Sequence, residues 1–183
     1  MIYRLSIALI ILLSFGTITF AQQQDAPLKV VFLRHGEKPK KGSNLTCAGF
    51  NRSLQLPGVI DKKFGIPSAI YVSALALGTE TKHCRMFETA IPLAVKYNIT
   101  LNTNFEEKDA DRLSSELLKQ KGTVLVIWEH KAIAPIVNAL GISQDLVWGD
   151  NDYDSIWIVS FDKGVAHLTK DTEGIVPSDK CPM

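Results

Sequence analysis

The sequence predicts an α/β protein in which a mostly parallel sheet carries helices on both faces and ends in a C-terminal hairpin. Short apolar segments alternate with amphipathic segments of helical period across residues 28–140, which is the order of strand–helix–strand units. The first apolar segment, residues 28–33, is nearly continuous and β-branched, as parallel strands buried on both faces are. No repeat, linker or low-complexity tract interrupts the alternation, so one domain is expected.

Strands are expected where apolar segments are bounded by turn-forming residues. After residues 28–33, strands are predicted at residues 69–73 and 124–128, with an edge strand at residues 99–101. Residues 155–161 and 165–169 flank the turn sequence Asp162-Lys163-Gly164. These two segments predict the terminal hairpin.

Helices are expected between the strands. Residues 46–64 should be mostly helical with an interruption near Pro57-Gly58, because proline removes a backbone hydrogen bond. Cys84–Tyr97 carries an apolar face of helical spacing, made of Phe87, Ala90, Ile91, Ala94 and Tyr97. Residues 109–121 should end at Gly122, and the last helix should run through Ile133, Ile136, Val137 and Leu140 to Gly141. Pro135 is expected in the first turn of this last helix, where its missing N–H costs little.

The N-terminal segment, residues 1–21, is predicted to be a secretory signal peptide. Arg4 is the only charge before Asp25, residues 5–13 are apolar, and small residues precede a cleavage site after Ala21. The alternative is an uncleaved membrane anchor, but the apolar stretch is short for a span and glutamines follow it at once. We therefore expect an exported domain of residues 22–183, periplasmic or secreted, without stable membrane insertion.

The charge balance argues against two classes of partner. The chain has 20 Lys and Arg against 19 Asp and Glu, and loss of residues 1–21 would remove Arg4 and no acid. A balanced chain has no general field to attract nucleic acid or an anionic membrane, so neither is expected. Any bound anion must be held by a local cluster. The oligomeric state is left open.

The three cysteines are Cys47, Cys84 and Cys181. An oxidising compartment permits one disulfide among them, and three pairings are possible. Cys47 and Cys84 both flank candidate active-site segments, so a bridge between them would brace the pocket. The alternative is that all three stay reduced as small apolar residues.

The tripeptide Arg34-His35-Gly36 follows the first predicted strand directly. An imidazole can attack phosphorus, an arginine can hold phosphoryl oxygens, and a glycine lets the backbone approach closely. His130 also follows an apolar strand. Because ligands of open α/β sheets bind at the carboxyl ends of the strands, both histidines are candidate site residues.

The chain resembles the histidine phosphatase superfamily, which includes phosphoglycerate mutases and acid phosphatases. The resemblance spans nearly all of residues 22–183. It rests on four segments in order, Leu33-Arg34-His35-Gly36-Glu37, Leu45-Thr46-Cys47-Ala48-Gly49, Arg85-Met86-Phe87-Glu88-Thr89-Ala90 and Trp128-Glu129-His130. It implies a three-layer phosphoglycerate mutase-like fold.

The resemblance also implies a role for each matched residue. His35 would be the nucleophile that becomes a phosphohistidine, and Arg34, Arg85 and His130 would bind the phosphoryl oxygens. Phosphoryl transfer depends mainly on positioning and on stabilising charge over three oxygens. Two arginines and a second imidazole can provide this, so no metal or other cofactor is expected.

The general acid is left open between Glu107, Glu106, Glu129 or none. Many relatives place an acidic residue about twenty residues past the second arginine, which favours Glu107. Glu129 would point away from His130 if both lay in extended backbone. An insertion, residues 74–84, separates Ser73 from Arg85 and departs from the family pattern. Thr79, Thr81 and Lys82 of this insertion are candidates to touch substrate, although a plain surface loop is favoured.

No catalytic role is expected for the remaining histidines or for the acidic run at residues 150–154. His83 and His167 are taken as structural or surface residues. The run Asp150-Asn151-Asp152-Tyr153-Asp154 resembles a calcium loop, but Ser155 and Phe161 stand where such a loop needs Gly and Glu. We expect it to shape the pocket rim or cap the hairpin instead.

The expected function is hydrolysis of small phosphomonoesters or related phosphoryl compounds through phospho-His35. The alternatives are a phosphate-ester-binding module that has lost turnover, and a narrower phosphatase acting on phosphohistidine or envelope sugars.

Overall fold

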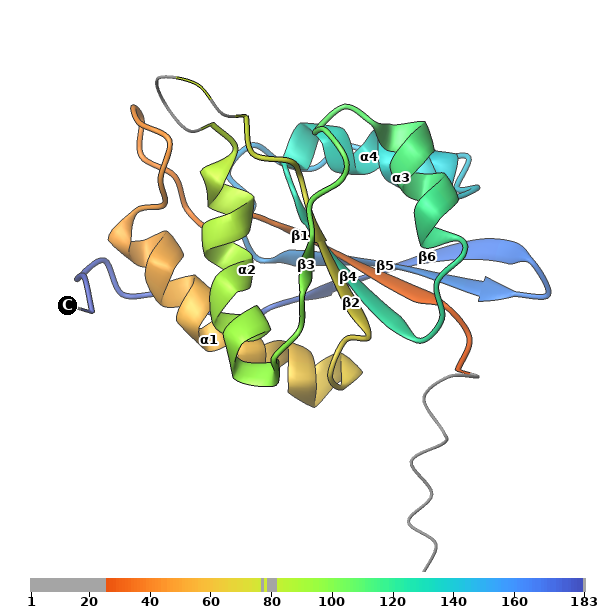
Figure 1. The fold of residues 1–183 in the computed structure, drawn as a ribbon, viewed down its shortest axis with the longest axis horizontal. Helices are drawn as coiled ribbons and strands as arrows, with labels where there is room; N and C mark the ends of the chain where they lie inside the picture. Colours follow the sequence, from red (N-terminus) through yellow and green to blue (C-terminus); the bar gives the residue numbers. More distant parts are fainter. Residues whose placement is uncertain (1–25, 77, 79–81, 183) are drawn as a thin grey trace, which may run out of the picture.

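The described residues of a computed structural model, 26–76, 78 and 82–182, form one six-stranded sheet (Figure 1). Its order is β3-β2-β4-β1-β5-β6. The strands are β1 (Lys29–Arg34), β2 (Ala69–Val72), β3 (Leu101–Asn102), β4 (Thr123–Trp128), β5 (Ser155–Asp162) and β6 (Val165–Thr172). β1 to β4 run parallel, and the β5–β6 hairpin joins antiparallel to β1. The signal peptide expected at residues 1–21 lies outside the described residues.

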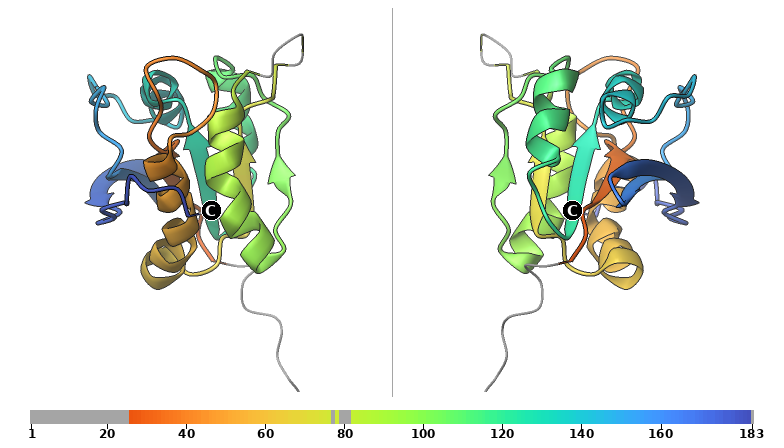
Figure 2. Two further views of the ribbon diagram at one scale, coloured as in Figure 1. Left: turned by 90° about the vertical axis from the view of Figure 1, so that its left-hand side faces the viewer. Right: turned by 90° about the vertical axis from the view of Figure 1, so that its right-hand side faces the viewer.

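Helices cover both faces of the sheet, as the two side views show (Figure 2). α1 (Cys47–Phe64) and α2 (Cys84–Tyr97) pack on one face, and α3 (Ala110–Leu117) and α4 (His130–Ala139) pack on the other. Alternate residues of β1 enter the two cores, with Val31 and Leu33 under α1 and α2, and Val30 and Phe32 under α3 and α4. This double burial explains the unbroken apolar run and confirms the predicted class.

Two predictions about prolines in helices were wrong. α1 continues through Pro57 without a break, because Leu56 and Ile60 on either side are fully buried. Their packing outweighs the roughly 3 kcal/mol that an interior proline costs. Pro135 lies in the second turn of α4, not the first. Within the described part of the chain, no helix is long and apolar enough to cross a membrane.

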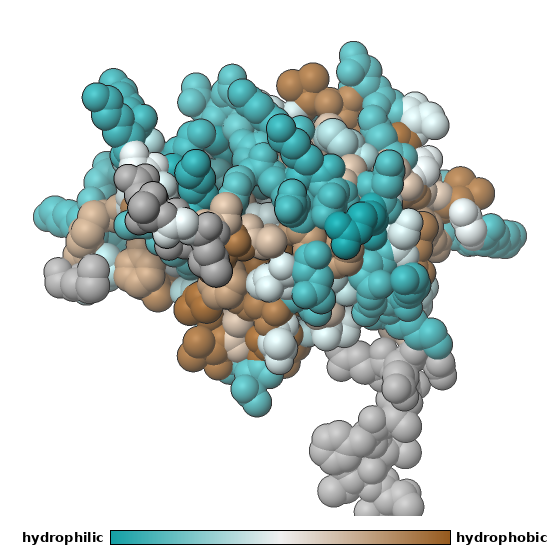
Figure 3. Space-filling model, turned by 45° about the horizontal axis from the view of Figure 1, so that its top comes forward, coloured by the Kyte–Doolittle hydropathy of each residue, from teal (hydrophilic) through white to brown (hydrophobic). Residues whose placement is uncertain are grey.

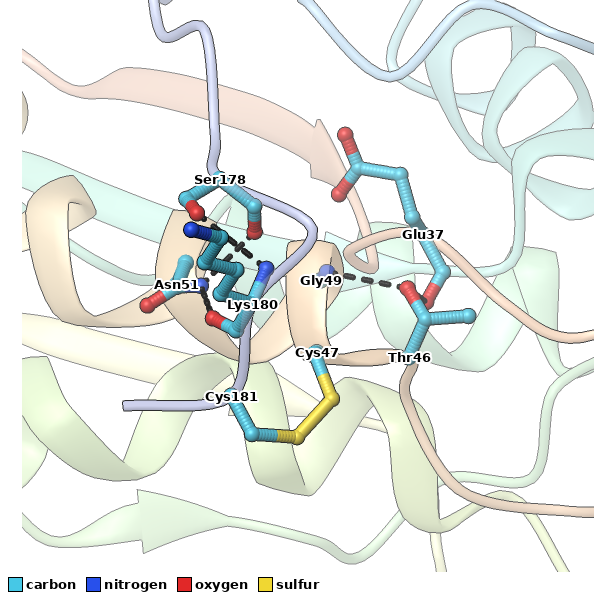
Figure 4. Close-up of a disulfide and its surroundings, with 8 residues drawn as sticks. All are labelled: Glu37, Thr46, Cys47, Gly49, Asn51, Ser178, Lys180 and Cys181. Carbon is cyan, nitrogen blue, oxygen red and sulfur yellow. Dashed lines mark hydrogen bonds between the residues drawn. A yellow bond between two sulfur atoms is a disulfide. The ribbon is translucent and has the colours of Figure 1, made fainter. Parts of the chain in front are cut away.

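A disulfide joins Cys47 at the start of α1 to Cys181 in the C-terminal tail (Figure 4). The bridge considered between Cys47 and Cys84 is therefore not the one formed. The side-chain amide of Asn51 donates to the carbonyls of Ser178 and Lys180, both at 2.7 Å. The tail is thus fixed to the first turns of α1.

Reducing this disulfide, or replacing Cys181 with serine, should lower the free energy of unfolding by about 2–4 kcal/mol. The bridge spans a sequence separation of 134 residues, so its loss frees a long loop in the unfolded chain. Urea unfolding with and without dithiothreitol measures the change. A Cys84→Ser variant is the matched control and should keep the wild-type response to reductant. An unfolding midpoint that reductant leaves unchanged would contradict the pairing.

Candidate active site

Parallel pairing brings the two histidine segments together at the carboxyl edge of the sheet. Arg34 at the end of β1 lies opposite Trp128 at the end of β4. The backbone N–H of His35 donates to the Trp128 carbonyl at 3.1 Å. The next residues along each chain, His35 and His130, therefore leave neighbouring strands at the same edge, as the sequence predicted.

His35 is held as a neutral imidazole. Its side chain is buried, and Nδ1 lies 2.7 Å from its hydrogen-bond partner, the Gly36 carbonyl. A carbonyl can only accept, so Nδ1 carries the proton and Nε2 keeps its lone pair. Burial lowers the pKa of His35 to about 4, the bond to Gly36 opposes this, and the charges of Arg34 and Arg85 add to it. Nε2 is therefore available as a nucleophile at neutral pH.

The loop after His35 depends on two glycines in contact. A Cβ on Gly36 would lie 2.8 Å from the Gly49 carbonyl oxygen, and a Cβ on Gly49 would lie 2.5 Å from the Glu37 carbonyl oxygen. Any side chain at either position would push the loop off α1. Gly36 and Gly49, from the first and second motifs, thus allow the loop after His35 to lie directly against the backbone of α1.

The third motif secures the same loop from α2. Thr89 Oγ1 accepts from the Gly36 N–H at 2.9 Å and donates to the Arg85 carbonyl at 2.7 Å. The Glu88 carboxylate accepts from the Leu45 N–H at 2.8 Å. Glu88 and Thr89 therefore tie the nucleophile loop to the helix that carries Arg85.

Arg34 is buried and only partly satisfied. Its Nη1 donates to the carbonyls of Gly149, Asp150 and Asp152 at 3.3, 2.7 and 3.1 Å, and its guanidinium lies 3.9 Å from the centre of the Tyr153 ring. Nε and Nη2 are buried with no hydrogen-bond partner among the described residues. Leaving such donors empty costs about 1–3 kcal/mol each, so they favour an anion beside His35.

His130 is clamped between two carboxylates. Its Nε2 lies 2.9 Å from Asp150 Oδ1, and this bond lowers the pKa of Asp150. Its Nδ1 lies 2.6 Å from Glu129 Oε1, in contact but without hydrogen-bond alignment. The expectation that Glu129 would point away from His130 was wrong, because Glu129 is extended whereas His130 begins α4. An anion would have to displace Asp150 to reach Nε2.

Arg85 reaches across to the loop before α1. Its guanidinium donates to the carbonyl oxygens of Gly42 and Asn44. Its backbone lies in the first turn of α2, and His83, the residue before this helix, supplies no side-chain cap. The positive end of α2 and the Arg85 charge thus lie at one place.

A cleft of about 230 Å³ brings together five of the candidate residues, His35, Lys82, Arg85, Glu107 and Glu129. It is lined by His35, Ser43, Lys82, His83, Arg85, Met86, Glu107 and Glu129. The carboxyl edge of the sheet lies at the top of Figure 1, and the surface there is largely hydrophilic (Figure 3). Arg34 and His130 are not among the residues that line it. A larger, mainly apolar cavity of about 360 Å³ beside the disulfide contains none of the predicted groups.

The three candidate acids are placed differently. Glu107 lines the cleft with His35, and its backbone carbonyl accepts from Trp128 Nε1 at 2.9 Å. Glu129 also lines the cleft, but its carboxylate is engaged by His130 and by the Lys131 N–H. Glu106 lines a neighbouring cavity instead. Position therefore favours Glu107.

Three further groups at the site were missed as site residues from the sequence. Asp150 and Tyr153 hold His130 and Arg34, and His83 lies 2.9 Å from Glu107. The acidic run that contains Asp150 was expected to shape the pocket rim or to cap the hairpin, and none of its residues lines the cleft. Asp152 caps the start of β5 by accepting from the backbone N–H of Ser155 at 2.9 Å. Of the insertion, Lys82 lines the cleft, whereas Thr79 and Thr81 lie outside the described residues.

Comparison with known proteins identifies the fold. No family model and no curated protein matches the sequence. The protein histidine phosphatase SixA complexed with tungstate superposes with a TM-score of 0.57 at 17% identity, over 80% of this chain and 97% of that one. A putative phosphohistidine phosphatase SixA from Agrobacterium tumefaciens gives 0.55 at 17% identity, over 82% and 99%. Phosphoglycerate mutase from Bacillus anthracis gives 0.52 at 14% identity, over 82% and 95%. The three-layer phosphoglycerate mutase-like fold is confirmed.

Proposed function

We propose that this chain is a phosphatase that hydrolyses phosphomonoesters through a phosphohistidine on His35. One observation carries the proposal. A buried imidazole held neutral with Nε2 unprotonated lies directly after a buried arginine, two of whose nitrogens have no hydrogen-bond partner in the described part of the chain. A nucleophile and unfilled cationic donors in adjacent positions suit an electrophilic phosphoryl group.

The reaction proceeds in two displacements. In the first, His35 Nε2 bonds to phosphorus, the bond to the ester oxygen breaks, and Glu107 gives that oxygen a proton. In the second, water attacks phosphorus, the P–N bond breaks, and Glu107 takes the proton from the water. Arg34, Arg85 and the first turn of α2 stabilise the charge on the phosphoryl oxygens in both steps. No metal ion takes part.

The shared fold supports a phosphoryl substrate. The neighbouring structures are of phosphohistidine phosphatases and a phosphoglycerate mutase, and one holds tungstate, an oxyanion of the same shape as phosphate. The leader-like residues 1–21 support export, which favours a phosphatase over a mutase of central metabolites. A small phosphorylated metabolite outside the cytoplasm, such as an envelope sugar phosphate, is the substrate class we propose.

A second candidate is a phosphate-ester-binding module without turnover. It is favoured by the bond between His130 Nε2 and Asp150, because this bond occupies a donor that the phosphoryl group would need. An aryl phosphate separates the two candidates, since its leaving group needs little protonation.

The purified domain of residues 22–183 should therefore release nitrophenol from p-nitrophenyl phosphate at a steady rate that EDTA leaves unchanged. In the proposed reaction Arg34 and Arg85 stabilise the charge and His35 is the nucleophile. Chelation of metal ions therefore removes no group that the reaction uses. Absorbance at steady state measures the rate, and the same assay with added magnesium is the control. Binding of the ester without release would establish the second candidate, and loss of rate in EDTA would overturn the metal-free mechanism.

A further inference from the structure

We propose that His83 is a positioning residue that holds Glu107 in the cleft and supplies and recovers the proton that Glu107 delivers. The inference rests on the proposed phosphatase function. From the sequence, His83 was expected to be a structural or surface residue.

The two side chains form a pair on one wall of the cleft. His83 Nδ1 lies 2.9 Å from Glu107 Oε2, and both residues line the cleft that contains His35. Their side chains are 34% and 24% exposed, so water and substrate can reach them. Both also line a second cavity of about 340 Å³ behind the cleft. The pair therefore separates two water-accessible spaces.

The backbone of His83 shows that its contribution comes from the imidazole. His83 occupies the N-cap position of α2 in the left-handed region, with φ 62° and ψ 19°, and its side chain makes no cap bond. A left-handed non-glycine residue costs about 1–2 kcal/mol, and such strain is found most often at functional sites. His83 does not cap the helix, so its contact with the Glu107 carboxylate accounts for a histidine at this position.

Glu107 is fixed from the other side. Its backbone carbonyl accepts from Trp128 Nε1 at 2.9 Å, at the end of β4. Trp128 is fully buried, so it gives this loop a rigid support. The carboxylate is thus held between a core tryptophan and His83, in the cleft that contains the nucleophile.

The pair solves a problem of proton supply. A carboxyl group that delivers a proton to the leaving oxygen must itself be supplied with one, and histidine is the side chain most often used to pass protons. His83 Nδ1 lies 2.9 Å from Glu107 Oε2, so a proton can pass between them without either side chain moving.

The proton is conserved through both displacements. In the first, the proton of the pair passes from Glu107 to the ester oxygen as the P–O bond breaks and the P–N bond forms. In the second, the proton of the attacking water passes to Glu107 and is shared again with His83 Nδ1. The pair ends with the proton with which it began, so no other donor is needed.

Other charged groups line the two cavities on which the pair lies. Lys82 and Arg85 flank His83 along the chain and in the cleft, and Glu129 faces them from the start of α4. Glu106 and Lys108 flank Glu107 and line the second cavity. His35 is held neutral and adds no charge. Two cations and one anion lie in the cleft, and one of each lies behind it.

The test compares His83→Asn with wild type on an alkyl phosphate, β-glycerophosphate, and on p-nitrophenyl phosphate between pH 5 and 9. Asparagine tolerates the left-handed backbone but cannot carry the proton. We expect kcat on the alkyl ester at pH 7.5 to fall about 10- to 100-fold. The rate on the aryl ester should change less than about threefold. His83→Gln, which keeps a long polar side chain, should behave like His83→Asn.

His167→Gln is the matched control, because it removes an exposed imidazole on β6, away from the cleft. It should reproduce the wild-type profiles on both esters. If His83→Asn hydrolyses the alkyl ester at the wild-type rate across this pH range, the inference about His83 is wrong, but the proposed phosphatase function still stands. Equal losses on both esters would also overturn the inference, since they would show a general structural role. Absence of aryl hydrolysis in wild type would overturn the proposed function, and the inference with it.

Discussion

Replacing His35 with alanine should reduce the turnover of p-nitrophenyl phosphate by about 10³-fold or more. The substitution removes the only atom proposed to bond to phosphorus, Nε2, while Arg34 and Arg85 still bind the ester. The KM should therefore change much less than kcat. Steady-state rates give both constants. The P–N bond of a phosphohistidine hydrolyses in acid but is stable in alkali, so enzyme given ³²P-labelled substrate and quenched in alkali should carry label in wild type and none in the variant. His167→Ala is the control.

The protonation state of His35 adds a pH signature to the same assignment. Burial lowers the pKa of His35 to about 4, so the imidazole is neutral above that pH and becomes a cation below it. Hydrolysis of the aryl ester should therefore be lost as the pH falls through about 4, and the nucleophile should impose no limit from pH 5 to 8. A His35→Ala variant that keeps most of the activity would show that the nucleophile is elsewhere.

The sequence was sufficient to bring His35 and His130 to one edge of the sheet because the local pattern and the global fold agree there. The apolar residues of β1 and β4 are buried on both faces, and such strands are legible as continuous apolar runs. Parallel pairing then brings the residues that follow them to one edge. Arg85 was identified by the resemblance to the histidine phosphatase superfamily, and the structure places it in the first turn of an amphipathic helix.

The sequence was insufficient where a contact joins distant segments or where packing outweighs propensity. Pro57 predicts a break in α1, yet burial of the neighbouring turns keeps the helix intact. His83 gives no local signal, because its partner lies in another loop and its insertion departs from the family spacing. The pairing of Cys47 with Cys181 depends on where the tail crosses α1, which no local pattern encodes.

A cluster of carboxylates around the buried Arg52 side chain fixes the loop that follows His35. Arg52 in α1 donates to both oxygens of Glu37, two residues after His35, at 2.8 to 3.1 Å. It also donates to Glu173 at 2.6 Å, and Asp154 lies 3.6 Å away. One guanidinium therefore faces more than one carboxylate. Burial raises the pKa of Glu173 to about 8, Arg52 opposes this, and the charges of Asp154 and Glu37 add to it.

Arg52→Met should lower the free energy of unfolding by about 3–5 kcal/mol, because it leaves the carboxylates without their cation.

The Glu173 carboxyl keeps its proton to about pH 8 when folded but loses it near pH 4.3 when unfolded. The folded state therefore binds more protons between these values, and wild-type stability should fall as the pH rises through that window. Glu173→Gln should abolish this part of the slope, whereas Asp145→Asn, at an exposed position, should keep it. Urea unfolding at pH 5, 6.5 and 8 measures these slopes. A slope that survives in Glu173→Gln would mean that Glu173 is ionised against Arg52 throughout. The loop that carries His35 would then be held by a fixed ion pair, with no dependence on pH.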